Sequence, residues 1–198
     1  ALVDWYLPAM TGTATPDAVR QSWRDAWHSV FEGSASSANT LVLRDYHVDN
    51  LMVLGGRSGA ARAGLLDFQD AVIGHPAYDL VSLLEDARRD VSDDLTQAMK
   101  ERYRAALPAV ADETLGPWYA ILGAQRHARV AGVFVRLCVR DGKPAYLTHI
   151  PRIMRLLERS LVVPELAPVK AWFDANLPDV TRSLPDFDPA AVRRLILL

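Results

Sequence analysis

Two aspartates and an asparagine at a definite spacing are the residues of this chain whose types suggest chemistry. Asp45 and Asn50 are separated by four residues in "RDYHVDN", and Asp67 follows in "LLDFQDA". Oxygen ligands of this kind suit Mg²⁺, which commonly takes one or two from the protein and the rest from phosphates and water. A further carboxylate beside such an ion can orient a hydroxyl and accept its proton. The set therefore indicates phosphoryl transfer from ATP, with Asn50 and Asp67 as metal and nucleotide ligands and Asp45 as the catalytic base.

A small β-hairpin is needed to bring these residues together. The apolar segments 51–54 and 63–66 are typical of strands, and the glycine-rich stretch between them is typical of a turn. If the turn is centred near Ser58 and Gly59, the antiparallel pairing places Asn50 directly opposite Asp67. Asp45 then lies on the loop that enters the same end of the hairpin.

The rest of the chain reads as mainly helical. Residues 16–32 predict one helix, and from residue 77 onward apolar residues recur at helical spacing. The longest helix is expected within 113–142, where Gly116 and Pro117 either interrupt it or begin it. The expected fold class is therefore α+β and mainly α, with the hairpin at the catalytic loop.

Composition excludes several classes of protein. Of the 198 residues, 50% are hydrophobic, and the formal net charge is −2. This balance allows a packed core and argues against a nucleic-acid surface built on bulk positive charge. The single cysteine, Cys138, is expected in the core and permits no disulfide within the chain. No apolar run is long enough for a membrane span and no signal peptide is visible, so we expect a cytoplasmic location and no membrane partner.

The motifs resemble those of the aminoglycoside phosphotransferase and choline kinase-like superfamily. The catalytic loop of that superfamily usually reads His-Gly-Asp-x-His-x-x-Asn, and its metal segment reads Ile-Asp-[Trp/Phe]-x-x-Ala. The matching positions here are Asp45, His47, Asn50, Asp67, Phe68 and Ala71. "GHPAYDL", residues 74–80, is similar to the segment that follows in the superfamily. Leu43 departs from the pattern, because these kinases usually carry histidine there.

The resemblance implies a protein-kinase-like fold of which residues 1–198 are the C-terminal lobe, the lobe that binds the acceptor and carries the catalytic residues. Neither Gly-x₄-Gly-Lys-Ser/Thr nor Gly-x-Gly-x-x-Gly occurs in the sequence. The N-terminal nucleotide-binding lobe is therefore expected to be absent from this chain. Within the superfamily, most of the chain resembles the bacterial kinases of cell-wall recycling, which phosphorylate the anomeric hydroxyl of N-acetylmuramate and N-acetylglucosamine.

Weaker candidates surround the central three residues. His47 either contacts phosphate or holds the loop, and Asp70 binds a second metal or substrate or hydrogen-bonds within the loop. Arg44 either neutralises a neighbouring acid or meets an anionic substrate. In the superfamily, the residue at Asp79 braces the catalytic loop or caps a helix. Asp49 is expected to stabilise the loop or to face solvent.

An acceptor with a carboxylate would need a cationic partner. Arg126 and Arg129 lie three residues apart and are candidates, against the alternative of a solvated basic stripe. Trp5 is a candidate for the sugar pocket or for the core. Two other functions stay open at this point: an aminoglycoside kinase, whose cationic acceptor would call for acids, and a non-catalytic binding module. The sequence leaves the oligomeric state undetermined.

Overall fold

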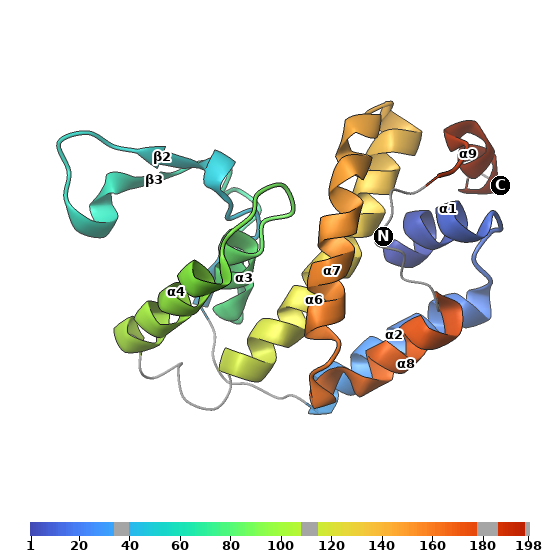
Figure 1. The fold of residues 1–198 in the computed structure, drawn as a ribbon, viewed down its shortest axis with the longest axis horizontal. Coiled ribbons are helices and arrows are strands. Elements are labelled where there is room, and N and C mark those ends of the chain that lie inside the picture. Colours follow the sequence, from blue (N-terminus) through green and yellow to red (C-terminus); the bar gives the residue numbers. More distant parts are fainter. Residues whose placement is uncertain (34–39, 108–114, 178–185, 197–198) are drawn as a thin grey trace. The chain divides into compact units, whose positions relative to one another are not determined.

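The computed structural model describes residues 1–33, 40–107, 115–177 and 186–196 of the chain. It divides into two compact units. The first unit comprises Ala1–Ala35 and Gly123–Leu198, and the second unit comprises Ser36–Leu122. Helix α6 (Leu115–Asp141) contributes residues to both units. Figure 1 shows the elements, which are mainly helices with two small antiparallel sheets.

The first unit is helical throughout its described residues. Its elements, besides the later part of α6, are η1 (Leu2–Tyr6), α1 (Leu7–Thr11), α2 (Asp17–Gly33), η4 (Pro144–His149), α7 (Ile150–Ser160), η5 (Pro164–Leu166), α8 (Ala167–Asn176) and α9 (Pro189–Ile196). Helices α2 and α8 lie side by side (Figure 1). The prediction of a helix over 16–32 is confirmed by α2.

An aromatic cluster joins α2 to α8. The rings of Trp23 and Trp172 lie 4.6 Å apart between centroids, and Phe173 meets Trp23 edge-on at 5.7 Å. The indole nitrogen of Trp172 donates a hydrogen bond to Ser22 Oγ at 3.0 Å, which satisfies the polar atom of a buried side chain. This cluster fixes how the two helices pack.

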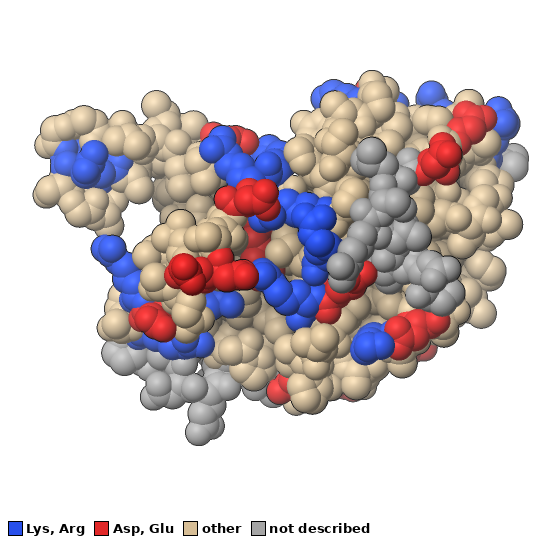
Figure 2. Space-filling view, viewed as in Figure 1, with Lys and Arg blue, Asp and Glu red and all other residues tan. Residues whose placement is uncertain are grey.

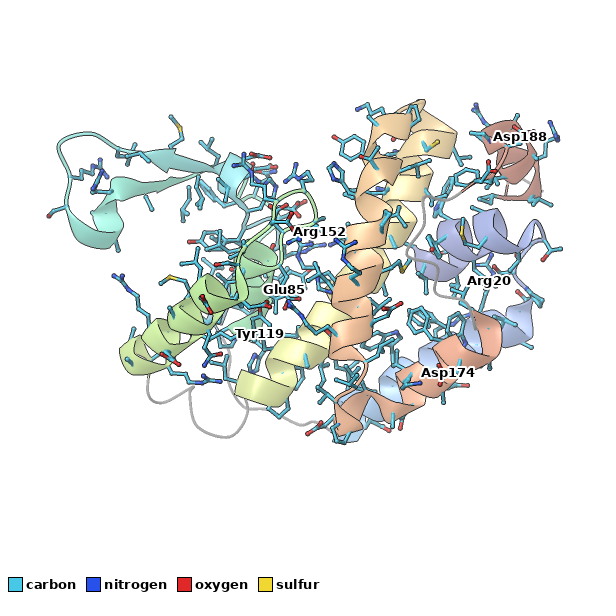
Figure 3. The ribbon with its side chains drawn as sticks, in the orientation of Figure 1. Arg20, Glu85, Tyr119, Arg152, Asp174 and Asp188 are labelled. Atoms are coloured by element: carbon cyan, nitrogen blue, oxygen red, sulfur yellow. The ribbon has the colours of Figure 1, made fainter. Side chains whose placement is uncertain are left out.

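The N-terminal segment packs closely on α6. A Cβ atom at Gly132 would lie 2.3 Å from the backbone of Ala1, so only glycine fits there. Thr15 donates a hydrogen bond to the carbonyl of Val3 at 2.6 Å, and Arg20, labelled in Figure 3, pairs with Asp4. These contacts anchor the helical start of the chain, which the sequence analysis did not predict.

The second unit carries both sheets. Its strands are β1 (Thr40–Val42), β2 (Leu51–Val53), β3 (Ala63–Leu65) and β4 (Val72–Gly74), its short helical turns are η2 (Val48–Asn50) and η3 (Gly59–Arg62), and its helices are α3 (Ala77–Leu84), α4 (Asp93–Ala106) and the first turns of α6. Strand β1 pairs with β4, and β2 pairs with β3, both antiparallel. The β2–β3 hairpin was predicted; the β1–β4 pairing was not.

A compact apolar core supports α3. Ala77, Val81 and Leu84 on α3 pack against Leu115 and Tyr119 at the start of α6, and Met99 and Tyr103 of α4 border the same cluster. Tyr119, labelled in Figure 3, also has the Lys100 ammonium 3.6 Å above its ring. The buried face of α3 is therefore held by two other helices.

The long helix was placed correctly and α3 was predicted too long. Gly116 and Pro117 begin α6 rather than interrupt it, and Gly142 follows the helix with a left-handed φ of 66°. The apolar residues of the segment 77–90 lie at helical spacing and predict one helix over the whole segment, but α3 ends at Leu84. The reason is local: the side chain of Asp86 accepts the backbone N–H of Arg88 at 2.7 Å, an alternative to the helical hydrogen bond.

Burial bears out one further expectation and leaves another unresolved. Cys138 lies in the core, 5% exposed, as its apolar neighbours predicted. Trp5 is only half-buried, so its exposure does not choose between a core and a pocket role. Of the described helices, none is both long and apolar enough to cross a membrane.

Candidate active site

Asp79 holds the start of the catalytic loop. It lies in the first turn of α3, and its two carboxylate oxygens accept the backbone N–H groups of Leu43 at 2.7 Å and Arg44 at 3.0 Å. Strand β1 ends just before these residues, so their amides have no ladder partner and the carboxylate supplies one. The expectation that Asp79 braces this loop is confirmed; the catalytic role of the loop stays a prediction.

Arg44 turns the chain into the loop in a left-handed conformation. Its φ is 69°, a value that side chains with a Cβ rarely adopt and that costs about 1–2 kcal/mol. Ser82 donates a hydrogen bond to the Arg44 carbonyl at 3.4 Å, and the Arg44 guanidinium donates one to the carbonyl of Asp70 at 3.4 Å. Asp70 thus meets Arg44 through its backbone, while its own side chain is exposed.

Asp45 and Asn50 are joined across the loop. The side-chain amide of Asn50 donates a hydrogen bond to the backbone carbonyl of Asp45 at 2.8 Å. The backbone N–H of Asn50 bonds to the carbonyl of His47 at 2.9 Å, which closes the short turn η2. Asn50 is half-buried and Asp45 is exposed, so the Asp45 carboxylate is accessible to a substrate.

The hairpin register differs by one residue from the predicted one. Leu51 pairs with Leu65 and Val53 pairs with Ala63, so Asn50 stands opposite Leu66 rather than Asp67. The N–H of Leu66 donates to the carbonyl of Asn50 at 3.0 Å, which confirms this alignment. The prediction was wrong because the glycine-rich connection contains the extra turn η3, which shifts the centre of the hairpin.

Asp67 leaves the strand immediately after this pair. A continued strand would point Asp67 and Leu66 to opposite faces of the hairpin, since side chains alternate along a strand. Its φ of 54° ends the strand conformation, so this alternation does not apply to its side chain. Asp67 is exposed, and its Oδ1 accepts a hydrogen bond from the Gln69 side chain. In the observed register Asp67 therefore follows Leu66, the residue opposite Asn50, and lies one position farther along the chain than the predicted pairing required.

The donor atoms of Asn50 and Asp67 fit a hard divalent cation. The Asn50 amide nitrogen is used by Asp45, which leaves its Oδ1 as an acceptor. Gln69 engages only Oδ1 of Asp67, and hydrogen bonds among the described residues leave Oδ2 open. Among the described residues, no group of three His, Cys, Asp or Glu side chains could hold a metal ion. The predicted pair would not form such a group, because only Asp67 of the two is one of these residue types. Two protein oxygens are a common complement for Mg²⁺ bound to phosphates.

Two arginines that the sequence analysis did not single out hold the middle of the loop. Arg88 lies 2.8 Å from His47 Nδ1 and 3.2 Å from Asp49 Oδ2, and Arg89 lies 2.8 Å from Asp49 Oδ1. Figure 2 shows basic and acidic side chains adjoining over the part of the second unit where η2 and the segment after α3 lie. Asp49 and His47 therefore hold the loop, which agrees with the loop-stabilising alternative for each.

The sequence did not predict the role of Arg88 and Arg89, for a physical reason. In a helix continued to residue 90, Arg88 and Arg89 would read as the solvated end of an amphipathic face. Only the early end of α3, near Glu85 in Figure 3, turns them toward the loop. The adjacent acid Asp86, which can bond to the backbone and end a helix, was the one available signal.

Charge and burial shift several pKa values around the loop. The hydrogen bond from Arg89 holds the pKa of Asp49 below its usual range, with the charges of Arg88 and Arg89 adding to the effect. Burial raises the pKa of Tyr46, and the nearby negative charge of Asp79 raises it further. Tyr46 is therefore protonated at neutral pH, and Asp49 is ionised.

His75 supports the N-terminus of α3. Its Nδ1 accepts the backbone N–H of Ala77 at 3.1 Å, and its ring stacks on Trp118 at 4.8 Å between centroids. The ring is 9% exposed, and burial lowers the pKa of His75. The neutral imidazole, with Nδ1 unprotonated, is the form that this hydrogen bond requires.

The other substrate candidates belong to the first unit. Arg126 is buried, at 8% exposed, and Arg129 and Trp5 are half-buried. The alternative of a solvated basic stripe is thus wrong for Arg126. A role for these three residues in the acceptor site stays a prediction.

Comparisons with known proteins give the site a context. A family model described as "Phosphotransferase enzyme family" matches residues 1–113. A Caulobacter vibrioides protein named N-acetylmuramate/N-acetylglucosamine kinase is 42% identical over 180 residues, which are 91% of this chain and 49% of that protein. Proteins of the same name from Neisseria meningitidis and Pseudomonas putida are 38% and 33% identical, over 85% and 83% of this chain and 51% and 49% of their own lengths. The chain spans about half the length of the curated relatives it matches.

Proposed function

Because this chain belongs to the phosphotransferase enzyme family, we propose that its protein transfers a phosphoryl group from ATP to an amino sugar. The acceptor is N-acetylmuramate or N-acetylglucosamine, and the reacting group is the anomeric hydroxyl. The observation that carries the proposal is the braced loop from Asp45 to Asn50 in a chain whose relatives are named for these sugars. The same proposal places the reaction in peptidoglycan recycling in the cytoplasm.

Asp45 is the proposed catalytic base. Its carboxylate is exposed, while its backbone carbonyl is tied to Asn50 and the chain just before it is held by Asp79. A carboxylate on such a held backbone can orient an acceptor hydroxyl and take its proton as the new bond to phosphorus forms. Positioning of this kind accounts for much of catalysis in phosphoryl transfer.

Asn50 and Asp67 are the proposed ligands of Mg²⁺ and, through it, of ATP. The bound ion would supply positive charge against the phosphate oxygens. The residues themselves contribute one amide oxygen and one carboxylate from two adjacent places on the β2–β3 hairpin. The hydrogen bond between Asn50 and Asp45 couples the position of the metal ligand to that of the base.

The other residues that bind the nucleotide are proposed to lie in an N-terminal lobe outside this chain. The hairpin and its surroundings expose apolar side chains, among them Val53 at 78% and Phe68 at 57%. Figure 2 shows the hairpin as largely uncharged surface with basic side chains at its far end. A second lobe and the nucleotide base would remove this apolar area from water. The lobe would also bring the phosphate-pairing lysine of kinases.

The acceptor-binding residues are proposed more broadly. Arg44, His47 and Asp70 flank the base in the second unit, and Trp5, Arg126 and Arg129 are candidates from the first unit. For N-acetylmuramate, a guanidinium is the expected partner of the lactyl carboxylate, since arginine binds carboxylates in a two-pronged manner. N-acetylglucosamine has no such carboxylate, so loss of this arginine should raise the KM of N-acetylmuramate more.

A transfer assay over a panel of acceptors tests the proposed function. The complete protein is incubated with Mg²⁺ and ATP labelled at the γ-phosphate, together with N-acetylmuramate, N-acetylglucosamine or an aminoglycoside. We expect labelled sugar 1-phosphate from the two amino sugars and none from the aminoglycoside. Labelling of the aminoglycoside alone would assign the antibiotic-kinase alternative, and labelling of none would leave a non-catalytic module.

A further inference from the structure

One guanidinium contacts both polar side chains in the middle of the catalytic loop. Arg88 places one terminal nitrogen 2.8 Å from His47 Nδ1 and the other 3.2 Å from Asp49 Oδ2. Arginine is always protonated, so it must donate, and His47 Nδ1 must accept. Residues 46–49 join Asp45 to Asn50, and Arg88 therefore holds the segment between the proposed base and the proposed metal ligand.

Arg88 is itself held from behind. The carboxylate of Asp86, whose side chain is 4% exposed, accepts the backbone N–H of Arg88 at 2.7 Å and lies 3.7 Å from its Nε. An exposed ion pair contributes little by itself, but a guanidinium fixed on several sides loses less side-chain entropy with each contact. The arrangement needs a planar fork, which lysine cannot supply.

The two ends of the loop have supports that do not involve Arg88. Asp79 holds the entry at Leu43 and Arg44, and the N–H of Leu66 holds the exit at the carbonyl of Asn50. Between them, the path of the chain is fixed by the short turn η2, by the hydrogen bond from the Asn50 side chain to the Asp45 carbonyl, and by the contacts that Arg88 and Arg89 make. Arg89 reaches Asp49 alone, from a side chain that is 55% exposed.

We propose that Arg88 is a positioning residue for the transfer reaction, which sets the relative placement of Asp45 and Asn50 through His47 and Asp49. The inference rests on the proposed function. Arg88 contacts His47 and Asp49, between the two residues that it positions, so we expect its loss to appear mainly in kcat. A displacement of about 1 Å in a reacting group can cost about a hundredfold in rate, and a loosened loop has this effect.

Amide hydrogen exchange tests the mechanical part without any assay of activity. In the complete protein, Arg88→Gln should speed exchange at His47 and Asn50, whose N–H groups are bonded within the loop. The N–H groups of Leu43 and Arg44 are the internal control, because Asp79 holds them independently of Arg88. Arg140→Gln, which removes an exposed ion pair with Asp141 in the first unit, is the matched control variant.

Steady-state kinetics test the catalytic part. For Arg88→Gln we expect kcat to fall about 10- to 100-fold, with KM for ATP and for the sugar within about threefold of the unsubstituted protein. Arg88→Lys keeps the positive charge near Asp86 but lacks the paired donors of the planar guanidinium. It should therefore fold even if Arg88→Gln does not, and its kcat should stay well below that of the unsubstituted protein. Arg89→Gln should lower kcat by less than either, and Arg140→Gln should leave it unchanged.

The outcomes separate cleanly. Faster exchange at His47 and Asn50 together with a selective loss of kcat supports the proposal. Unchanged exchange, or kcat at the level of the Arg140→Gln control, overturns it. If Arg88→Gln does not fold, Arg88→Lys decides by the same two measurements. If the unsubstituted protein phosphorylates no acceptor, the proposed function fails by itself, and the exchange result still shows whether Arg88 holds the loop.

Discussion

Asp45 and Asp67 are both exposed carboxylates on one short stretch of chain, yet their proposed tasks predict different kinetic losses. Asp45 acts on the acceptor hydroxyl, and general-base assistance is worth about 10²–10⁴-fold. Asp45→Asn in the complete protein should therefore lower kcat by about that factor and leave the affinity for Mg²⁺–ATP unchanged. Asp67→Ala removes a proposed metal ligand and should abolish binding of Mg²⁺–ATP.

Initial rates and calorimetric titration with Mg²⁺–ATP separate these two effects. Gln69→Ala is a useful control for Asp67, because it removes only the neighbour that bonds to Oδ1. Similar, mild reductions in kcat for Asp45→Asn and Asp67→Ala would contradict both assignments.

Arg44 offers a stability test of the strained entry to the loop. Its left-handed backbone favours glycine, so Arg44→Gly should be about 1 kcal/mol more stable than Arg44→Ala. The same two substitutions at Arg24, in the interior of α2, should show the opposite order, since glycine costs about 1 kcal/mol relative to alanine in a helix. Urea unfolding of the four variants measures both differences. An Arg44→Ala variant as stable as Arg44→Gly would show that the positive φ carries no cost.

The residue scale is also where the sequence was most informative. Asp45, Asn50 and Asp67 could be proposed as site residues, and Asp79 as a brace, because their residue types and spacing are typical of a known loop. Arg88 was not, because its role depends on where α3 ends and on contacts with residues about forty positions earlier in the sequence. A long-range contact of this kind leaves no periodic signal in a single sequence.

At the scale of elements, Asp79 links α3 to the loop by two backbone hydrogen bonds. In Asp79→Asn the amide nitrogen cannot accept, so one of the two N–H groups at Leu43 and Arg44 loses its partner, at about 1–3 kcal/mol. The substitution also removes a negative charge from the first turn of a helix. Asp94→Asn does the same on α4 and should cost only about 0.3–1 kcal/mol. Urea unfolding compares the two variants; equal losses would mean that Asp79 acts only through the helix dipole.

His75 makes the stability of the same helix depend on pH. Burial lowers its folded-state pKa below the unfolded value of about 6.5, so folding favours the neutral ring. Its contribution is therefore fully present above about pH 6.5 and is lost as the pH falls through the lowered folded-state pKa. The free energy of unfolding should rise with pH across this window.

His75→Asn is the variant that isolates this effect. The Asn side-chain oxygen can accept the N–H of Ala77 as Nδ1 does, but it does not titrate, and it does not stack on Trp118. Unfolding free energies between about pH 5 and pH 8 should depend less on pH in His75→Asn than in the unsubstituted chain. An unchanged pH dependence would assign it to the other histidines.

Element positions were predicted better than element pairing. Helical periodicity located α2 and α6, because both bury apolar side chains. The β1–β4 pair was missed because its strands are three residues long and lie about thirty residues apart in sequence. The hairpin was found, but its register was off by one residue because the conformation of a glycine-rich connection is not visible in a hydrophobic pattern.

At the scale of the whole molecule, the family match and the relatives' names support the proposal of an amino-sugar kinase, to which this chain would contribute the proposed base and metal ligands. The chain covers about half the length of those relatives. The sugar was predicted from the resemblance and not from any physical property of residues 45–67. The spacing of a base and two metal ligands would be the same for any acceptor hydroxyl.

The most direct test of this account compares residues 1–198 with the complete protein in the same assay, with ATP, Mg²⁺ and N-acetylmuramate. Positioning of the γ-phosphate requires the nucleotide lobe, so we expect sugar phosphate from the complete protein and no measurable turnover from residues 1–198. Adding an N-terminal β-rich segment with a phosphate-pairing lysine should restore it. Turnover by residues 1–198 alone, with micromolar binding of Mg²⁺–ATP, would contradict the account, as would a complete protein that phosphorylates no amino sugar.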